Sequence, residues 1–484
     1  MIGPACVTVF TPPTDFQINL NEPVDPSSVQ PSDRTVNGIP ADSAAVINGN
    51  TTIAFIFNTS PVVPGVNTMH IAAGAFDCGP PVDFTCVFRF DTPRATPTPR
   101  PRPTPHVRPN TVTVTNGNDS GPGSLRQAVS DAPNGYMIQF DPGVTNITLT
   151  SGQITIGVSL SIIGPGANSL TIGSSPSGVF LANTNSTTIS ISGLTIASSG
   201  GAISSNARMT INQCVISNNT TTAITNTGTM SIVDSTISNN TFGGVVNDGS
   251  MTITRCTING NSSGLGGGIN NNSGSLTITN STINDNFASN NPGQEFGGGI
   301  YNNAWMTISN CTISGNLAGG SPFGDGAGGG IGNTGNLEIL SSTVADNFAS
   351  GLLVARGGGI VGGGSTTADS TIIALDTVFG ARMNNAPDFS GALQSMGYNI
   401  IGNNDGASIS SQPTDQIGTP GAPIDPRLGP LANNGGPTFT RALQAGSPAI
   451  NRGDPAAPPQ DQRGYGRVEL PDVGAFEFQG NSPR

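Results

Sequence analysis

Between residues 203 and 360, apolar and polar positions alternate in a pattern that repeats along the chain. A block of alternating residues followed by a polar bend and a final asparagine recurs six times: Met209–Asn219 (MTINQCVISNN), Met230–Asn240, Met251–Asn261, Leu276–Asn286, Met306–Asn316 and Leu337–Asn347. Alternation with a period of two is typical of β-strands, and no helical period is present in these blocks. The repeat therefore predicts short strands that stack on one another.

The spacing of the repeats predicts a parallel β-helix. Anchor residues in "G-[GAV]-I-x-N" steps are separated by 21, 21, 24, 31, 31 and 29 residues: Ile203, Ile224, Val245, Ile269, Ile300, Ile331 and Ile360. A turn of about 21 residues with two or three short strands forms one coil, which pairs with the next at about 4.8 Å. The longer spacings predict loops that project from the later coils. Irregular precursors extend the pattern back to about Val112, which gives about eleven coils.

The first 110 residues have a different organisation. Residues 1–90 contain short alternating runs separated by Pro, Gly, Asn and Asp, a pattern typical of a β-sandwich. Residues 91–110 read DTPRATPTPRPRPTPHVRPN, and such alternating proline favours an extended, semi-rigid spacer. The sandwich region resembles the immunoglobulin-like modules of bacterial surface proteins, most clearly over residues 8–77, and such modules commonly act as spacers or stalks.

Asparagine recurs at the end of each block, at Asn219, Asn240, Asn261, Asn286, Asn316 and Asn347. Side-chain amides stacked at one position of every coil can hydrogen-bond along the axis, and Asn tolerates the left-handed backbone of a tight bend. A second series follows the anchors, at Asn226, Asn247, Asn271, Asn302 and Asn333. We interpret both series as structural ladders and not as a ligand-binding stripe.

Cysteines and large apolar residues also recur at fixed coil positions. Cys214, Cys256 and Cys311 lie two coils apart, about 9.6 Å, which exceeds the roughly 7 Å between Cα atoms that a disulfide spans, so we expect core thiols. In the first module, Cys78 and Cys86 are able to pair across a hairpin, which would leave Cys6 over. Large apolar residues directly follow three of the block-ending asparagines and predict an internal apolar stack: Phe287, Leu317 and Phe348.

Composition excludes several functions. The chain has 484 residues, 17 arginines, no lysine and two histidines, His70 and His106. The absence of lysine excludes a P-loop lysine and Schiff-base chemistry, and two distant histidines argue against a zinc site or a histidine-based triad. A net charge of −12 argues against a nucleic-acid partner. The chain contains no run of 18 apolar residues, so the sequence predicts no membrane span. The first ten residues do not have the pattern of a signal peptide.

Two further segments resemble a known family. Thr111–Gly166, with the motif DSGPGSLRQAV at Asp119–Val129, resembles the entry segment of bacterial right-handed, pectin-lyase-like β-helix surface proteins. SLRQAVSDA reads as a short amphipathic helix that caps the open end of the coils, whose unpaired strand edges would otherwise aggregate.

The far end of the chain resembles the choice-of-anchor Q module that closes such helices. The resemblance rests on DPRLGPLANNGGPTFTRALQAGSPAINRGDP at Asp425–Pro455 and DQRGYGRVELPDVGAFEF at Asp461–Phe478. The module's charged residues, interpreted as a structural network, are Arg441, Asp461, Arg463, Arg467, Asp472 and Glu477.

Candidate catalytic residues are few. The long loops before three successive anchors carry Glu295, Asp325 and Arg356, which are able to converge on one flank. The resemblance implies polysaccharide lyases or glycoside hydrolases as relatives, and a lyase would use carboxylates, often with Ca²⁺, and an arginine. The loops are glycine-rich and no acidic series follows the coils, so we interpret these charges as solvated and expect no metal and no cofactor, with Ca²⁺ only in the lyase alternative.

The predicted fold class is all-β: an Ig-like sandwich at 1–90, a linker at 91–110, a right-handed parallel β-helix at 111–390 and a closing module at 391–484. The predicted function is adhesion or carbohydrate binding by an extracellular or cell-surface protein, with a polysaccharide or cell-surface glycan as partner. The alternatives are a polysaccharide lyase or glycoside hydrolase acting on a polyuronate or similar glycan at the long-loop flank, and a purely structural envelope component.

Overall fold

A computed structural model describes residues 14–20, 22–63, 65–76, 84–174, 176–289, 295–319, 325–351, 354–380 and 383–479, except for 91–109. The chain forms two compact units, residues 1–106 and 107–484, which are treated separately below. The predicted linker at 91–110 lies almost wholly outside the described residues, as do Cys6, Cys78 and the side chain of Cys86. No helix in the described part is long and apolar enough to cross a membrane.

The first unit consists of two small antiparallel sheets. One sheet has the order β1-β5-β4 and the other β3-β2-β6-β7, with bounds β1 (Asp15–Asn19), β2 (Arg34–Val36), β3 (Ile39–Pro40), β4 (Ser43–Ile47), β5 (Thr52–Ile56), β6 (Gly65–Ile71) and β7 (Phe84–Phe90). Alternate residues such as Ile18, Val36 and Phe55 are buried in a shared core. The unit is therefore all-β, and its assignment as Ig-like stays a prediction.

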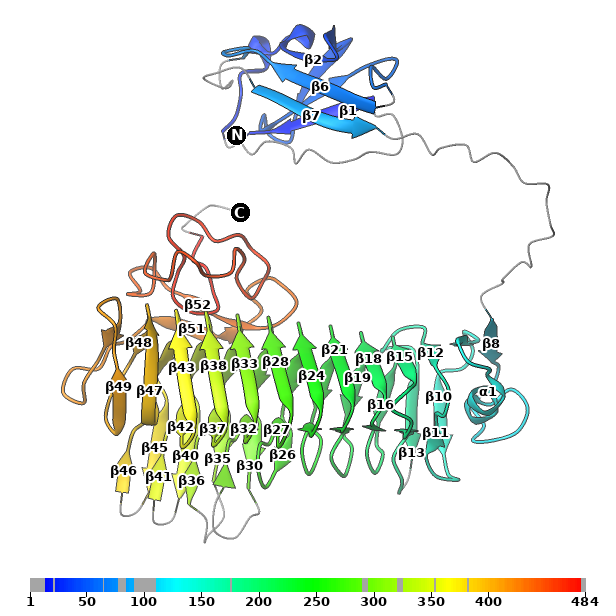
Figure 1. The fold of residues 1–484 in the computed structure, drawn as a ribbon, viewed down its shortest axis with the longest axis vertical. Helices are drawn as coiled ribbons and strands as arrows, with labels where there is room; N and C mark the ends of the chain where they lie inside the picture. Colours follow the sequence, from blue (N-terminus) through cyan, green and yellow to red (C-terminus); the bar gives the residue numbers. More distant parts are fainter. Residues whose placement is uncertain are drawn as a thin grey trace. The chain divides into compact units, whose positions relative to one another are not determined.

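The second unit is a right-handed parallel β-helix with three ladders of stacked strands (Figure 1). The first ladder contains β8 (Thr111–Val114), β9 (Tyr136–Phe140), β12 (Leu160–Ile163), β15 (Thr188–Ser192), β18 (Arg208–Asn212), β21 (Thr229–Val233), β24 (Ser250–Thr254), β28 (Ser275–Thr279), β33 (Trp305–Ser309), β38 (Asn336–Leu340), β43 (Ser365–Asp369), β47 (Phe389–Gly397) and β49 (Ala407–Ser410).

The second ladder lies beside the first and ends in the same long strand, β47. It contains β11 (Ile154–Thr155), β14 (Phe180–Ala182), β17 (Ile203–Ser205), β20 (Ile224–Asn226), β23 (Val245–Asn247), β27 (Ile269–Asn271), β32 (Ile300–Asn302), β37 (Ile331–Asn333) and β42 (Ile360–Gly362). The third ladder contains β10 (Asn146–Leu149), β13 (Thr171–Ser174), β16 (Thr195–Ala197), β19 (Val215–Ser217), β22 (Thr236–Ser238), β25 (Thr257–Asn259), β29 (Thr282–Asn284), β34 (Thr312–Ser314), β39 (Thr343–Ala345), β44 (Ile372–Ala374), β48 (Ile400–Ile401) and β50 (Gln416–Ile417).

The coils continue further than expected. The third ladder has twelve strands within the described residues, close to the predicted eleven coils, and its parallel pairing runs through Ile417. The boundary predicted at residue 390 therefore falls inside the coil stack. The segment that resembles a closing module supplies the last strands itself, because Ile400 and Ile401 repeat the buried pair Ile372 and Ile373.

Alternation explains both the strands and the core. In the first ladder the inward positions stack the same residue types from coil to coil, as with Ile211, Ile232 and Ile253, all fully buried. Burial of each such side chain contributes about 1.5–3 kcal/mol of hydrophobic stabilisation. The thiols of Cys214, Cys256 and Cys311 are also buried and unpaired, as the spacing predicted, and burial raises the pKa of Cys256 and Cys311 to about 12.

The bend that ends each repeated block uses left-handed backbone, but not at the residue expected. The residue directly before each ladder asparagine has a positive φ, as at Asn218 (57°) and Asn239 (56°), or is a glycine, as at Gly260 (65°). Asn and Gly accept this conformation at low cost. The ladder asparagines serve instead as hydrogen-bonding residues, so the expectation that they supply the left-handed conformation was wrong.

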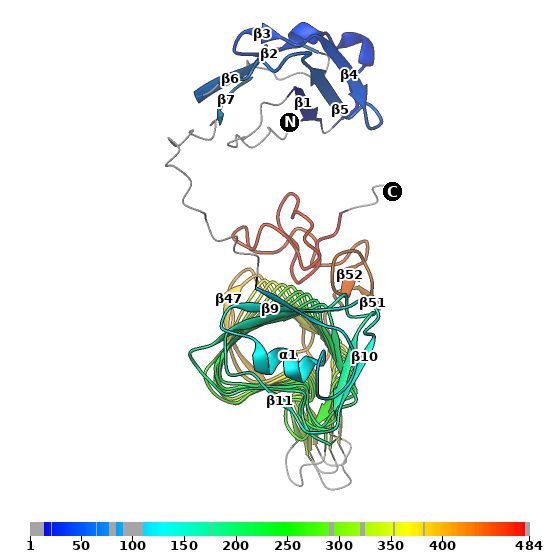
Figure 2. The same cartoon turned by 90° about the vertical axis from the view of Figure 1, so that its right-hand side faces the viewer.

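A short helix covers the first end of the coils. Helix α1 (Leu125–Asp131) lies across the coil opening, with Leu125, Ala128 and Val129 buried against it (Figure 2). The Ser124 side chain caps its N-terminus by accepting a hydrogen bond from the Gln127 backbone N–H. Arg126 pairs with Asp119 at 2.7 Å, which ties the helix to the preceding loop. The predicted cap is therefore present.

The projecting loops form a double-sheet ridge. One sheet contains β26 (Ser262–Ser263), β30 (Phe287–Ala288), β35 (Leu317–Ala318), β40 (Phe348–Gly351) and β45 (Thr377–Gly380), and the other β31 (Glu295–Phe296), β36 (Gly326–Ala327), β41 (Val354–Arg356) and β46 (Met383–Asn385). The two backbones approach so closely that a Cβ on Gly326 would lie 2.5 Å from the Ala318 carbonyl oxygen.

This close approach corrects one expectation about the ridge. Phe287, Leu317 and Phe348 are only half-buried, and the following alanines take the fully buried positions: Ala288, Ala318 and Ala349. The predicted internal stack of large residues is therefore wrong. The sheets are too close for large side chains between them, and only Ala and Gly fit.

The closing segment, residues 425–479, packs along the side of the third ladder and not over its end (Figure 1). It contains β51 (Leu428–Ala432) and β52 (Thr440–Leu443). Leu443, Val473 and Phe476 cover Ile372 and Ile400 of the ladder. The outward side chains of the last coils are buried for this reason.

Candidate functional site

The outer face of the first ladder carries a regular row of hydroxyl groups, with the carboxylate of Glu338 at one position of the row. Outward positions at the centre of successive strands pair in register: Thr210, Ser231, Thr252, Thr277, Thr307, Glu338 and Thr367. Successive members lie about 4.8 Å apart, the spacing of paired strands. We call this surface the hydroxyl face. Thr252 donates to Ser231 Oγ at 3.1 Å, so part of the row is ordered by its own hydrogen bonds.

The single tryptophan of the chain stands at the edge of this face. Trp305 begins β33, is 68% exposed and lies in register between Ser275 and Asn336. The neighbouring strands hold small or polar residues at the same position, so the indole is the one large aromatic group at this edge in these strands. Sequence reasoning missed Trp305, although its position directly before the Met306 block identified it as outward-facing.

A groove lies beside the second ladder, next to the ridge. It has a volume of about 190 Å³ and is lined in part by Phe296, Thr334, Arg356 and Ser390. The Phe296 and Tyr301 rings lie 6.4 Å apart, and the Thr334 hydroxyl lies 3.2 Å from the Tyr301 hydroxyl. The groove therefore combines aromatic surface, hydroxyl groups and one exposed guanidinium.

Two of the three candidate catalytic residues lie on strands of one ridge sheet, Glu295 on β31 and Arg356 on β41, and Asp325 directly precedes β36 of the same sheet. Arg356 is exposed on β41, and among the described side chains none forms an ion pair with it. Asp325 accepts a hydrogen bond from the Val354 backbone N–H at 2.9 Å, so one of its oxygens holds the neighbouring strand. Glu295 pairs with Gly326 along the backbone, but its side chain lies outside the described part. Convergence of the three residues stays a prediction.

Among the described residues, no group of three His, Cys, Asp or Glu side chains is arranged to hold a metal ion.

The asparagines ending the six blocks form one continuous hydrogen-bonded ladder. Asn286 donates from its backbone N–H and its Nδ2 to Asn316 Oδ1, both at 3.0 Å, and Asn316 donates in the same way to Asn347. Each of these side chains is at most 1% exposed: Asn219, Asn240, Asn261, Asn286, Asn316 and Asn347. Since their polar atoms are used within the ladder, these side chains do not face a ligand.

The ladder continues into two acidic residues that sequence reasoning missed. Asp376 accepts both hydrogen bonds from Asn347, and Asp388 accepts from the Asp376 backbone N–H at 3.0 Å. Burial raises the pKa of both carboxyls, to about 7 for Asp388, and the neighbouring Asp388 raises that of Asp376 further. The signal was available, because Asp376 follows Asn347 by 29 residues, the spacing of the corresponding anchors Ile331 and Ile360.

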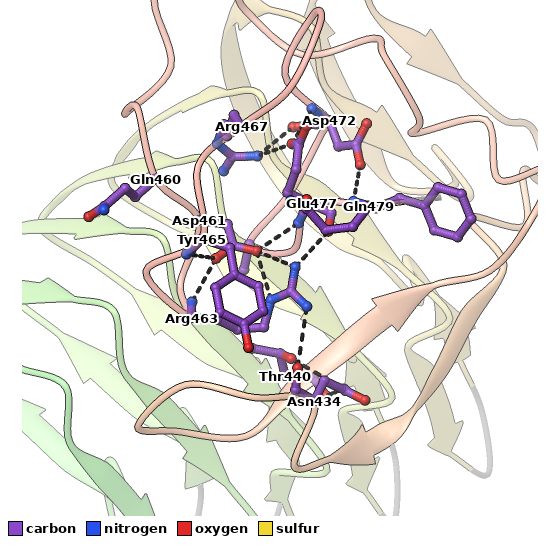
Figure 3. Close-up of polar contacts among 12 residues, drawn as sticks. Asn434, Thr440, Gln460, Asp461, Arg463, Tyr465, Arg467, Asp472, Glu477 and Gln479 are labelled. Carbon is purple, nitrogen blue, oxygen red and sulfur yellow. Dashed lines mark hydrogen bonds and ion pairs between the residues drawn. The ribbon is translucent and has the colours of Figure 1, made fainter. Parts of the chain in front are cut away.

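The charged residues of the closing segment form a buried network (Figure 3). Arg463 pairs with Asp461 at 2.7 Å and Arg467 with Glu477 at 3.1 Å, and all four side chains are nearly inaccessible. Burial is the main cause of the raised pKa of Asp472, about 6. Arg441 forms an ion pair with Asp346 of the coil stack. These contacts join loops to one another and to the coils, which is the structural arrangement expected for them.

One comparison, with models of protein families, agrees with the coil architecture. A family model described as "Right handed beta helix region" matches residues 166–321. A comparison with curated proteins finds no match to this chain. Among solved structures, pectate lyase Pel9A aligns with a TM-score of 0.47 at 15% identity, over 76% of this chain and 96% of that one. The PL6 family alginate lyase AlyGC aligns with a TM-score of 0.32 at 12% identity, over 75% of this chain and 57% of that one.

Proposed function

We propose that this chain is a non-catalytic glycan-binding protein, and that it binds a polysaccharide on the hydroxyl face with Trp305 as its anchor. The observation that carries the proposal is the exposed indole beside an ordered row of Ser and Thr hydroxyls. An aromatic face packs on the apolar face of a sugar ring, and neighbouring hydroxyls exchange hydrogen bonds with the sugar hydroxyls.

The shape of the site favours an extended ligand. The strands of the first ladder repeat the same outward residue types in register over successive coils. A polymer with repeating sugars is able to place several units on such a surface, and many weak contacts then add up to useful affinity. The groove with Phe296 and Arg356 offers further contact on the neighbouring ladder.

The proposal includes a location outside the cell or at its surface. It is supported by the resemblance of residues 111–166 and 391–484 to surface β-helix proteins and their choice-of-anchor Q module. Residues 1–90, as an Ig-like module, would then act as a spacer or stalk.

Tryptophan fluorescence tests this function directly, because Trp305 is the only tryptophan and therefore reports on one place in the chain. We expect saturable changes in emission on titration with a polysaccharide that a glycan array identifies. Trp305→Ala should weaken binding at least tenfold, measured by calorimetry, and Trp305→Phe should retain part of it because a ring remains. Phe242→Ala, which removes an exposed aromatic ring outside the first ladder, is the matched control.

Two outcomes would contradict the proposal. Binding of the selected glycan that is unchanged in Trp305→Ala would move the site elsewhere. Release of unsaturated uronide absorbance from a polyuronate, lost in Arg356→Ala, would show an enzyme at the long-loop flank.

A further inference from the structure

A second cavity lies between the last coils and the closing segment. It has a volume of about 650 Å³, within the range of roughly 300–1,000 Å³ that is usual for small-molecule sites. Tyr398 and Thr414 line it from the coils, and Asn451, Arg452 and Leu470 from the closing segment. None of the residues of the hydroxyl face lines this cavity.

The walls of the cavity are held in place by hydrogen bonds. The Tyr398 backbone N–H donates to Thr414 Oγ1 at 3.0 Å, which fixes the bend that presents the ring. Gln416 Nε2 donates to the Pro448 carbonyl oxygen at 2.9 Å and so joins the two walls. The Asn451 backbone N–H donates to Asp472 Oδ1 at 2.7 Å. A ligand would therefore enter a preformed site and lose little free energy in ordering it.

The charged residues that line the cavity are one anion, Asp415, and one cation, Arg452. Asp415 Oδ1 accepts from the Ser395 hydroxyl and the Asn399 backbone N–H, and Glu469 accepts from Asn451 Nδ2 at 2.8 Å. Arg452 is exposed and, among the described residues, has neither an ion pair nor a side-chain hydrogen bond, unlike Arg463 and Arg467.

The lining fits an acidic sugar. A guanidinium recognises a carboxylate or sulfate with two parallel hydrogen bonds. The Tyr398 ring and the half-exposed Leu470 provide apolar surface for a sugar ring, and Thr414 and Asn451 provide polar groups for its hydroxyls. We propose that the cavity between coils and closing segment is a second binding site, for a sugar residue that carries an acidic group.

A matched pair of probes tests this site. Methyl glucuronide and methyl glucoside differ only in a carboxylate in place of a hydroxymethyl group, and ligand-observed NMR titration compares their affinities. We expect the acid to bind at least tenfold more tightly than the neutral sugar, and Arg452→Ala to abolish that preference. Arg452→Lys should restore only part of it, because lysine keeps the charge without the planar fork.

Further arms separate this proposal from the first. Tyr398→Asn, which keeps a residue that tolerates the φ of 57°, should weaken both sugars, whereas Trp305→Ala should weaken neither. Equal binding of glucose 6-sulfate would show that charge, and not carboxylate shape, is recognised. The proposal is overturned if neither acidic sugar binds saturably, or if Arg452→Ala keeps the preference for the acid. Either result leaves glycan binding at Trp305 intact.

Discussion

At the scale of single residues, Asp376 occupies a ladder position where the preceding coils have asparagine. In those coils the amide nitrogen donates to the next ladder oxygen, as Asn316 Nδ2 does to Asn347 Oδ1 at 2.9 Å. Asp376 Oδ2 stands in place of that nitrogen, is buried and has no hydrogen-bond partner among the residues that the structure describes. An ionised Asp376 would place two acceptors side by side, its own Oδ2 and the next ladder oxygen, on Asp388. Burial and the neighbouring Asp388 therefore raise the pKa of Asp376.

Asp376→Asn should therefore stabilise the chain by about 1–3 kcal/mol near pH 8, because it supplies the missing donor. A carboxyl with a raised pKa in the folded chain lowers the free energy of unfolding as the pH rises from its ordinary value towards the raised one, about 7 for Asp388. The gain should consequently shrink near pH 4, where the carboxyl is protonated in the folded chain and about half protonated in the unfolded one.

Urea unfolding at the two pH values measures this difference. Asp285→Asn, an exposed position in an earlier coil, is the control and should change little. A loss of stability in Asp376→Asn, or a gain of the same size at both pH values, would contradict the explanation.

Part of the candidate site could not be predicted from the identity of its residues alone. The outward position of Trp305 follows from strand alternation, but its 68% exposure depends on which described loops pass over it, and that has no periodic signal. Asp325 illustrates the opposite case, since its role in holding Val354 depends on how two long loops pair. Periodicity assigns inward and outward positions, whereas contacts between loops have no periodic signal.

At the scale of elements, the coil is stabilised by ladders that run perpendicular to its strands. Asn316 illustrates this arrangement: its side chain accepts from Asn286 twice and donates to Asn347 and to the Ile283 carbonyl oxygen at 2.9 Å. The spacing of the repeats was sufficient to predict which residues stack. It was not sufficient to predict the thin double-sheet ridge, because the close approach at Gly326 depends on two loops that fold back together.

Asn316→Ala should lower the free energy of unfolding by about 2–6 kcal/mol. The change leaves two buried donors of Asn286 without their acceptor, and each unsatisfied buried group costs about 1–3 kcal/mol. The midpoint of urea unfolding measures the effect. Asn272→Ala removes an exposed amide that donates to Asp248, and should cost less than about 0.5 kcal/mol. Equal losses in the two variants would show that the ladder adds nothing beyond an ordinary surface contact.

At the scale of the whole second unit, the closing segment stabilises the last coils from the side. Gln462 Nε2 donates to Thr282 Oγ1 at 2.9 Å, and Arg467 donates to Asn310 Oδ1 at 3.2 Å, so the segment contacts coils well before the end of the stack. The resemblance to a closing module predicted a connection to the coils but not its place. Residues 425–479 are mostly irregular, and only the buried charges suggested that they form a network.

Arg467→Ala should therefore loosen one end of the unit and leave the rest unchanged. Arg467 is the buried partner of Glu477, and removal of one member of a buried ion pair costs about 3–5 kcal/mol because the other charge remains without compensation. In a stack where each coil contacts mainly its neighbours, this loss stays local. Hydrogen exchange should become faster in residues 425–479 and in β34 and β39, with no change in β18 and β21, and Arg208→Ala should leave all of them unchanged. Uniformly faster exchange across the coils would instead show that the closing segment and the whole stack unfold as one cooperative unit.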